Sequence, residues 1–241
     1  VGRQALNSNT TASSNTAVGY QAGYANTTGD LLVAVGGQSL YSNTTGQRNT
    51  GVGWYSLVLN TTGNYNTAFG NQALYANTTA SRSTAVGYQA LYSSTTSDNT
   101  AVGYRALYNT TTNGGLTAIG GNAGFTNTTG EITAVGYAAL YYNTTGDQST
   151  AVGVNALYSN TTGAYNTAVG RGSLQNNTTA SNNTAVGYQA GYSNTTANSN
   201  TSIGYQAGYT NSTGLYNTFI GVQSGYTSNV NGNSGNTCVG F

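Results

Sequence analysis

Charged side chains are almost missing from this chain. Of its 241 residues only five are basic and four are acidic, and there is no histidine. An enzyme needs acids, bases or metal ligands in its site, so this inventory argues against catalysis. The net charge of +1 comes without a basic patch, which argues against nucleic-acid binding. We therefore expect neither an enzyme nor a nucleic-acid-binding protein, and no cofactor.

Other absences narrow the class further. A single cysteine cannot build a disulfide framework. No apolar run is long enough for a membrane-spanning helix, and no signal peptide is visible. Disordered chains are rich in charge and proline, whereas this chain has no proline and 21 tyrosines. Its threonine, valine and tyrosine content favours β-structure instead.

The chain is a tandem repeat from end to end. A motif that usually reads Asn-Thr-Ala-Val-Gly recurs about every 17 residues, with its glycine at positions from Gly2 to Gly240. This period suits one coil of a β-solenoid and is too short for helical or propeller repeats. We expect a single all-β parallel β-solenoid (β-roll) over residues 1–241, with about 14 coils of 17 residues and no helices.

Aligned coils indicate which positions face inward. The residue before the motif glycine is Val, Ile or Phe, and the residue two before it is almost always Thr. Both lie on one face of a strand, which we expect to be the core, so a charge at Val102 or Val152 should unfold neighbouring coils. The small residue between them would face outward. That face would either tolerate alanine on a flat sheet or receive another backbone in close packing.

Three further positions carry structural expectations. The residue three after the glycine is always Ala or Ser, as at a tight inner corner, and the next is always Leu or Gly. Tyrosine usually follows and should stack from coil to coil. Asparagine four before the glycine alternates with Leu or Ile, which predicts an inward corner with stacked amides.

The repeated unit, for example Asn15-Thr16-Ala17-Val18-Gly19 followed by Ala22, resembles the head repeats of YadA-type trimeric autotransporter adhesins. Similar repeats occur in phage tail-fibre-like and environmental tandem-repeat proteins. The resemblance implies a left-handed parallel β-roll in a surface-exposed adhesive or fibrous assembly, and it carries over no catalytic residue. The coil of that family is shorter, and the inserted Asn-Thr-Thr-Gly corner is the departure of this chain.

The Asn-Thr-Thr corner matches the acceptor pattern for N-glycosylation in 12 coils. We expect it to be solvent-exposed and to carry sugar, on the asparagine or on the threonine hydroxyls. The alternative is that Asn, Thr and Gly are turn formers copied by duplication. The candidate asparagines are Asn9, Asn26, Asn43, Asn60, Asn77, Asn109, Asn127, Asn143, Asn160, Asn177, Asn194 and Asn211.

The few charged residues offer little chemistry. Glu131 and Asp147 fall near one corner of adjacent coils, as solvated turn residues or, alternatively, as a weak Ca²⁺ site. Arg82 and Asp98 are placed to pair across adjacent coils. Cys238 replaces alanine and should be a small packing residue. We expect no metal site.

These features favour a structural subunit of an extracellular or cell-surface filament that is glycosylated. The motif is cut at Val1-Gly2 and at Val239-Gly240-Phe241 without a capping unit, which predicts a segment of a longer chain or fibre that associates end to end. Lateral or trimeric packing is a further option. The alternative is an adhesin or phage-fibre head that binds a host surface, and a minor alternative is an ice-binding solenoid. Ice binding is disfavoured because the Thr column is placed inward.

Overall fold

The computed structural model describes residues 2–226 and 234–240. Fourteen short parallel strands follow one another in chain order in one sheet. The described residues contain no helix, and so none that could cross a membrane. The predicted all-β parallel solenoid is confirmed. The strands are β1 (Thr16–Val18), β2 (Val33–Val35), β3 (Thr50–Val52), β4 (Thr67–Phe69), β5 (Thr84–Val86), β6 (Thr100–Val102), β7 (Thr117–Ile119), β8 (Ile132–Val135), β9 (Ser149–Val152), β10 (Thr167–Val169), β11 (Thr184–Val186), β12 (Thr201–Ile203), β13 (Thr218–Ile220) and β14 (Thr237–Val239).

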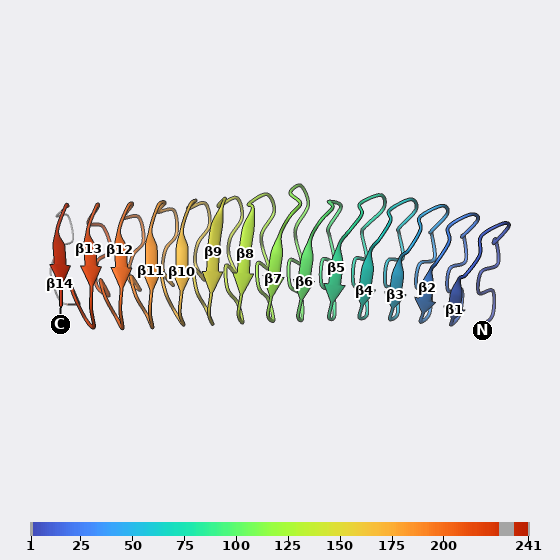
Figure 1. Cartoon of the computed structure of the whole chain (residues 1–241), viewed down its shortest axis with the longest axis horizontal. Coiled ribbons are helices and arrows are strands. Elements are labelled where there is room, and N and C mark those ends of the chain that lie inside the picture. The colour runs from blue at the N-terminus through green and yellow to red at the C-terminus, as the bar shows by residue number, and fades with distance from the viewer. Residues whose placement is uncertain (1, 227–233, 241) are drawn as a thin grey trace. The chain divides into compact units, whose positions relative to one another are not determined.

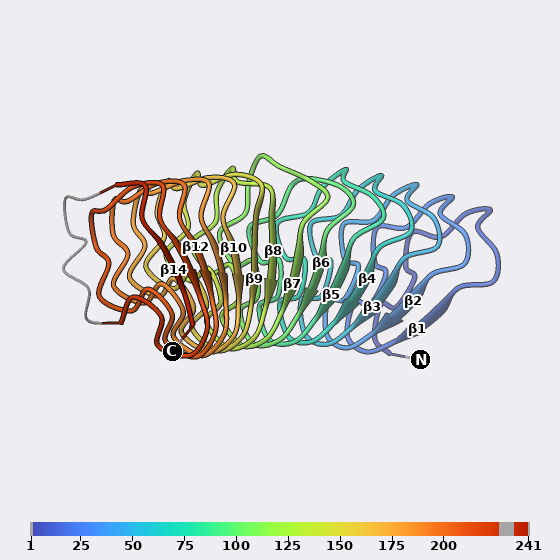
Figure 2. The ribbon, with the colours of Figure 1, turned by 60° about the vertical axis from the view of Figure 1, so that its left-hand side comes forward.

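The coils divide into two compact units, Val1–Thr117 and Ala118–Phe241. The first contains β1 to β6 and the second contains β8 to β14, and the division falls within β7. Within each unit the strands point the same way (Figure 1). Wherever the structure describes it, the rest of the coil returns as an irregular loop (Figure 2). Both units are therefore built from the same coil.

Adjacent strands pair without any shift of the repeat. Strand β1 pairs with β2 so that Ala17 lies opposite Ala34. The same register holds between β10 and β11. Each residue therefore stacks on its counterpart in the next coil. A position in the repeat becomes a column of like side chains along the unit.

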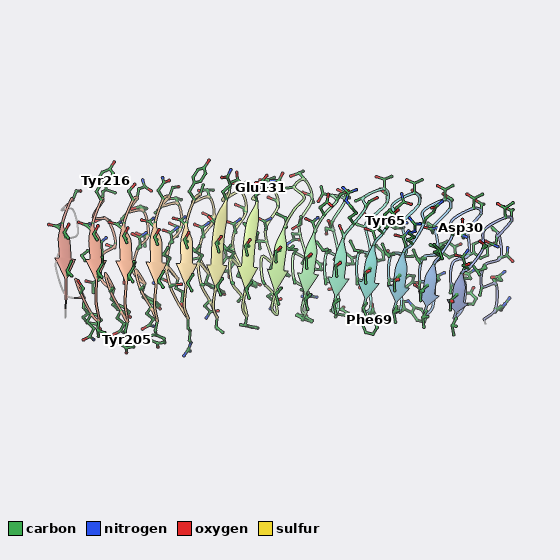
Figure 3. All side chains as sticks on the ribbon, in the orientation of Figure 1. Asp30, Tyr65, Phe69, Glu131, Tyr205 and Tyr216 are labelled. Carbon is green, nitrogen blue, oxygen red and sulfur yellow. The ribbon has the colours of Figure 1, made fainter. Side chains whose placement is uncertain are left out.

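The two faces of the sheet are the reverse of the prediction. The middle residue of the Thr-Ala-Val triplet is buried in β1 to β13, as Ala151 is at 0% exposure, whereas the flanking Val152 is 37% exposed and Phe69 is 57% exposed. Phe69 projects away at the carboxyl end of β4 (Figure 3). The prediction that the Val and Thr columns form the core is wrong, and so is the prediction of an outward alanine face.

Alanine and not valine faces the core because the interior of the coil is narrow. A Cβ built on Gly51 would lie 2.5 Å from the Ser39 hydroxyl oxygen and 3.4 Å from Leu40 Cγ. The loop thus crosses directly behind the sheet, and beside Leu40 only a small residue such as Ala, Ser or Gly fits between them. The predicted inner corner is confirmed at Ala22 and Ser39, which are fully buried. The core is therefore alanine from the sheet and leucine from the loop.

The alternation of Leu and Gly after that corner has a backbone cause. Leu40 and Leu91 adopt φ of 51° and 52°, and Gly191 adopts 59° at the same place. Few residue types take this left-handed conformation, and glycine does so without strain. Leucine fills the core at a backbone cost, and glycine removes the cost but leaves space. The sequence showed the alternation without its reason.

Stacked side chains reinforce each coil from outside the core. Tyr24 stacks on Tyr41 with ring centroids 5.1 Å apart, and Tyr192 stacks on Tyr209 at 5.0 Å, as predicted. A second column, which the sequence did not reveal, links Gln38 Nε2 to Gln21 Oε1 at 2.7 Å. These columns join successive coils within a unit.

Candidate interaction surfaces

The outward face of the sheet is a surface of threonine and aliphatic side chains, here called the Thr–Val face. It consists of the first and third residues of each Thr-Ala-Val triplet, such as Thr150 and Val152 of β9 and Thr167 and Val169 of β10. The Thr side chains are half-buried or exposed, and the Val, Ile and Phe side chains are exposed or half-buried. The face carries no charged residue in the described strands. Each unit thus presents an uncharged, partly apolar stripe to its surroundings.

Among the residues that the structure describes, the threonine hydroxyls of this face have no hydrogen-bond partner. In the described part of the chain, no hydrogen bond joins the hydroxyl of Thr150, Thr167 or Thr184 to another group, and the same is true of their counterparts in the other strands. Threonine stands at this place in thirteen of the fourteen strands, with Val33 as the exception. These hydroxyls remain available to something outside the coil.

The asparagines of the Asn-Thr-Thr corner are buried, contrary to the predicted exposure. Asn43 and Asn160 are 0% exposed. The Nδ2 group of Asn160 donates to Asn143 Oδ1 at 2.7 Å and to the Gly163 carbonyl at 2.9 Å. We call these side chains the corner ladder. It comprises Asn26, Asn43, Asn60 and Asn77 in the first unit and Asn127, Asn143, Asn160, Asn177, Asn194 and Asn211 in the second.

Two of the twelve candidate asparagines depart from this ladder. Asn9 is exposed, although it accepts a bond from Asn26 Nδ2 at 3.1 Å. Asn109 is half-buried and lies one residue before the ladder position, which Thr110 occupies and where it is buried. The acceptor pattern at Asn109 is therefore out of register with the others.

The ladder is interrupted after Asn77 and again after Asn194. Ser94 takes the place of asparagine after Asn77, and Asn77 Oδ1 is left without a hydrogen-bond partner among the described residues. Asn211 accepts from its own corner at Gly214 N, and Asn194 Oδ1 likewise has no partner in the described chain. A small cavity beside Gly191 and Gly208 adjoins this second break.

The two threonines of the corner differ sharply. The hydroxyl of the first donates to a backbone carbonyl of the next coil, as Thr44 does to Thr61 at 3.1 Å and Thr161 does to Thr178 at 3.0 Å. The second threonine, such as Thr45 or Thr162, is exposed. The corner therefore combines a buried amide, a bonded hydroxyl and a solvent-facing hydroxyl.

The asparagines four before the motif glycine behave as predicted. Asn49 and Leu32 are both buried at this corner. Asn49 Oδ1 accepts the backbone N–H of Asn66 at 2.9 Å, and its Nδ2 donates to the Gly63 carbonyl at 2.6 Å. Leucine fills the same volume without these bonds.

Two of the acidic side chains, those of Asp30 and Asp147, accept backbone hydrogen bonds from a neighbouring coil. Asp147 accepts the backbone N–H of Glu131 at 2.7 Å, and Asp30 accepts that of Ser13 at 2.6 Å. Asp30 and Glu131 lie near the end of the coil that leads into the strands (Figure 3). The described residues contain no group of three or more metal-ligating side chains. Glu131 and Asp147 are adjacent, as predicted, and the Asp147 carboxylate accepts the Glu131 backbone N–H.

The predicted pair of Arg82 and Asp98 is confirmed. Arg82 Nε and Nη2 donate to the two Asp98 carboxylate oxygens at 2.6 and 2.8 Å. Through these bonds Asp98 raises the pKa of Arg82, and Arg82 lowers the pKa of Asp98. Both side chains remain well exposed, so the pair adds little stability. Cys238 is a free thiol that packs against buried Phe219, in keeping with a packing role.

Comparison with protein-family models, with curated proteins and with solved structures found no match.

Proposed function

We propose that this chain is a structural segment of an extracellular fibre and that copies associate side by side through the Thr–Val face. The observation that carries the proposal is the exposed aliphatic column, in which Val18 is 46% and Ile203 is 39% exposed. Contiguous exposed apolar stripes are rare on isolated soluble proteins and are typical of interfaces. A fibre also needs no concave site, only a surface that repeats.

The occupant best suited to this face is another copy. The stripe repeats once per coil, at about the 4.8 Å spacing of paired strands. Only a partner with the same repeat can contact it in the same way at every coil. The near-zero net charge imposes no electrostatic repulsion between copies. Under this proposal, trimeric packing and flat lateral packing would both bury this surface, and the resemblance to surface β-rolls supports the extracellular setting.

A matched pair of double variants tests this proposal. Val152→Lys with Ile203→Lys places two charges on the Thr–Val face, and Tyr165→Lys with Tyr216→Lys places two charges at equally spaced exposed sites elsewhere. We expect light scattering and electron microscopy to show assemblies for the parent chain and the tyrosine variant only. Circular dichroism should show both variants folded. A parent chain that is monomeric at all concentrations would rule the proposal out, as would unchanged assembly of the first variant.

A second candidate, binding of an ordered water lattice such as ice, is favoured by one observation. The sheet threonines face outward, and no other described residue bonds to their hydroxyls, so the reason for disfavouring this function no longer applies. Regularly spaced hydroxyls beside methyl groups could hold water in fixed positions. Thermal hysteresis in the parent chain, lost in Val152→Lys with Ile203→Lys and kept in the tyrosine variant, would support it. Absence of hysteresis in a monomeric parent chain would refute it.

A further inference from the structure

The second threonine of the corner forms a row of exposed hydroxyls. For ten of these residues the hydroxyl has no hydrogen-bond partner in the described part of the chain, although the preceding threonine usually has one. We call these ten residues the outer threonine row. They are Thr11, Thr28, Thr45, Thr62, Thr79, Thr145, Thr162, Thr179, Thr196 and Thr213, and all ten are exposed.

This position does not vary, unlike the exposed position after the motif glycine. It is threonine in all thirteen successive coils from Thr11 to Thr213. The exposed position after the motif glycine holds residues as different as Arg3, Trp54 and Val154. Duplication alone would let both positions drift equally. The constancy of the outer threonine therefore needs a cause of its own.

Contacts within the coil do not explain why the outer threonine is constant. The corner ladder explains the asparagine, because its amide joins adjacent coils inside the protein. The hydroxyl of Thr161 explains the first threonine, because it holds the Thr178 carbonyl. At Thr162 only the backbone N–H bonds to the next coil, at the same Thr178 carbonyl, and any residue with an N–H could do this. The side chain is kept for a contact outside the coil.

We propose that the outer threonine row is the site of O-linked glycosylation. The inference rests on the proposed extracellular fibre and names where its sugar is attached. In each transfer the threonine Oγ1 bonds to the anomeric carbon of a nucleotide-activated sugar. The bond from that carbon to the phosphate oxygen breaks, the nucleoside diphosphate leaves with the electron pair, and the hydroxyl proton passes to a base of the transferase.

The corner asparagines are unsuited to the same role in the folded chain. An N-linked sugar bonds to Nδ2, and in Asn160 this nitrogen is buried and uses both hydrogens in bonds to Asn143 and Gly163. A sugar there would replace one of these hydrogens and would need space inside the coil. The outer threonine, two residues later, directs its hydroxyl to solvent and loses no internal bond on modification.

Site mapping on native material tests the proposal, with the unmodified recombinant chain as reference. Alkaline β-elimination should convert threonines of the outer row and leave Thr44 and Thr161 intact. Amidase treatment should leave Asn43 and Asn160 unchanged. Native peptides of unmodified mass would overturn the proposal, and so would sugar found on the asparagines or on the first threonines. Fibres seen by electron microscopy in such unmodified material would show that this inference fails while the fibre stands.

A pair of recombinant variants tests the premise that the row has no internal role. Thr162→Val should leave the urea midpoint of unfolding unchanged. Thr161→Val should lower it, because the bond to the Thr178 carbonyl is lost. An equal loss in both variants would mean that the outer threonine is kept for stability, which would remove the basis of the proposal.

Discussion

The ring of Phe219 fills the space beside the α-carbon of Gly225, where a Cβ would lie 2.2 Å from the ring. Phe219 replaces the small residue of the other strands, and Gly225 replaces leucine. We expect Phe219→Ala to destabilise by about 3 kcal/mol by opening a cavity, and Gly225→Leu to destabilise by overpacking. The double variant should be more stable than the sum of the two losses implies. Urea unfolding of the four proteins measures this coupling, and strict additivity would contradict it.

The reversed faces of the sheet give a direct test at neighbouring residues. Ala151→Asp should destabilise by about 3 kcal/mol or more, because it places an unpaired charge in a site with 0% exposure. Val152→Asp should leave folding nearly intact, because that side chain faces solvent. Circular dichroism during thermal unfolding would compare the two. The opposite order would restore the original assignment of the faces.

The asparagines of the corner ladder should contribute far more to the free energy of unfolding than neighbouring residues on the same loop. Asn177 donates to Asn160 Oδ1 at 2.7 Å and accepts from Asn194 at 2.8 Å, and it is fully buried. Asn177→Ala leaves buried polar groups without partners and should cost about 3 kcal/mol. Asn176→Ala, one residue earlier, should change stability by less than about 0.5 kcal/mol. Chemical denaturation gives both values, and a similar cost at the two sites would contradict a special role for the ladder.

Two glycine columns should differ in tolerance although both are crowded. Gly170 has φ of 128°, and a Cβ there would lie 2.4 Å from the Gly187 carbonyl oxygen. At Gly163 the distance to the Ala180 carbonyl oxygen would be 2.2 Å, yet Ala80 and Ala180 occupy the same column elsewhere. Gly170→Ala should therefore cost about 2 kcal/mol or more, and Gly163→Ala much less. Thermal unfolding of the pair checks the order, which would be reversed if contact distance alone decided it.

Stability should depend on pH mainly at alkaline values. The chain has no histidine, and partial burial raises the pKa of Tyr92 and Tyr209 above 10.0 because it disfavours the phenolate. Their contribution is fully present below pH 10 and is lost as pH rises through the higher folded-state pKa. Phenolate absorbance and circular dichroism should change together above pH 10. Ionisation of all the tyrosines near their ordinary pKa, with the fold intact, would be inconsistent with this.

At low pH the exposed pair of Arg82 and Asp98 should have only a small effect. The pKa of Asp98 is lowered, so its contribution is present above the ordinary carboxyl pKa and is lost as pH falls through the folded-state value. In Arg82→Gln the Asp98 pKa should return toward 3.8, as measured by NMR titration. An unchanged Asp98 pKa in that variant would mean that Arg82 does not cause the shift.

The repeat period was enough to predict the fold, because a parallel stack is the simplest way to pair strands separated by one short loop. Which face of the sheet is buried was not predictable from the alternation of side chains along each strand alone. In Thr-Ala-Val the apolar valine looks like the core residue, but the narrow interior selects alanine. The exposure predicted for ten of the twelve acceptor asparagines was wrong for a related reason. A corner rich in Asn and Thr is typical of a polar surface turn. Only the geometry of the coil shows that asparagines at the same position of successive coils bond to one another in the protein interior.

The corner ladder also gives each stack a polarity. Every link that joins Asn143, Asn160, Asn177 and Asn194 runs from Nδ2 of the later residue to Oδ1 of the earlier one. The side-chain dipoles therefore align instead of cancelling, and hydrogen bonds aligned in this way reinforce one another. One end of such a ladder offers an acceptor and the other a donor. Two stacks of coils can continue the ladder across their junction only when both run in the same N-to-C direction. If one stack were inverted, two donors or two acceptors would face each other at the junction.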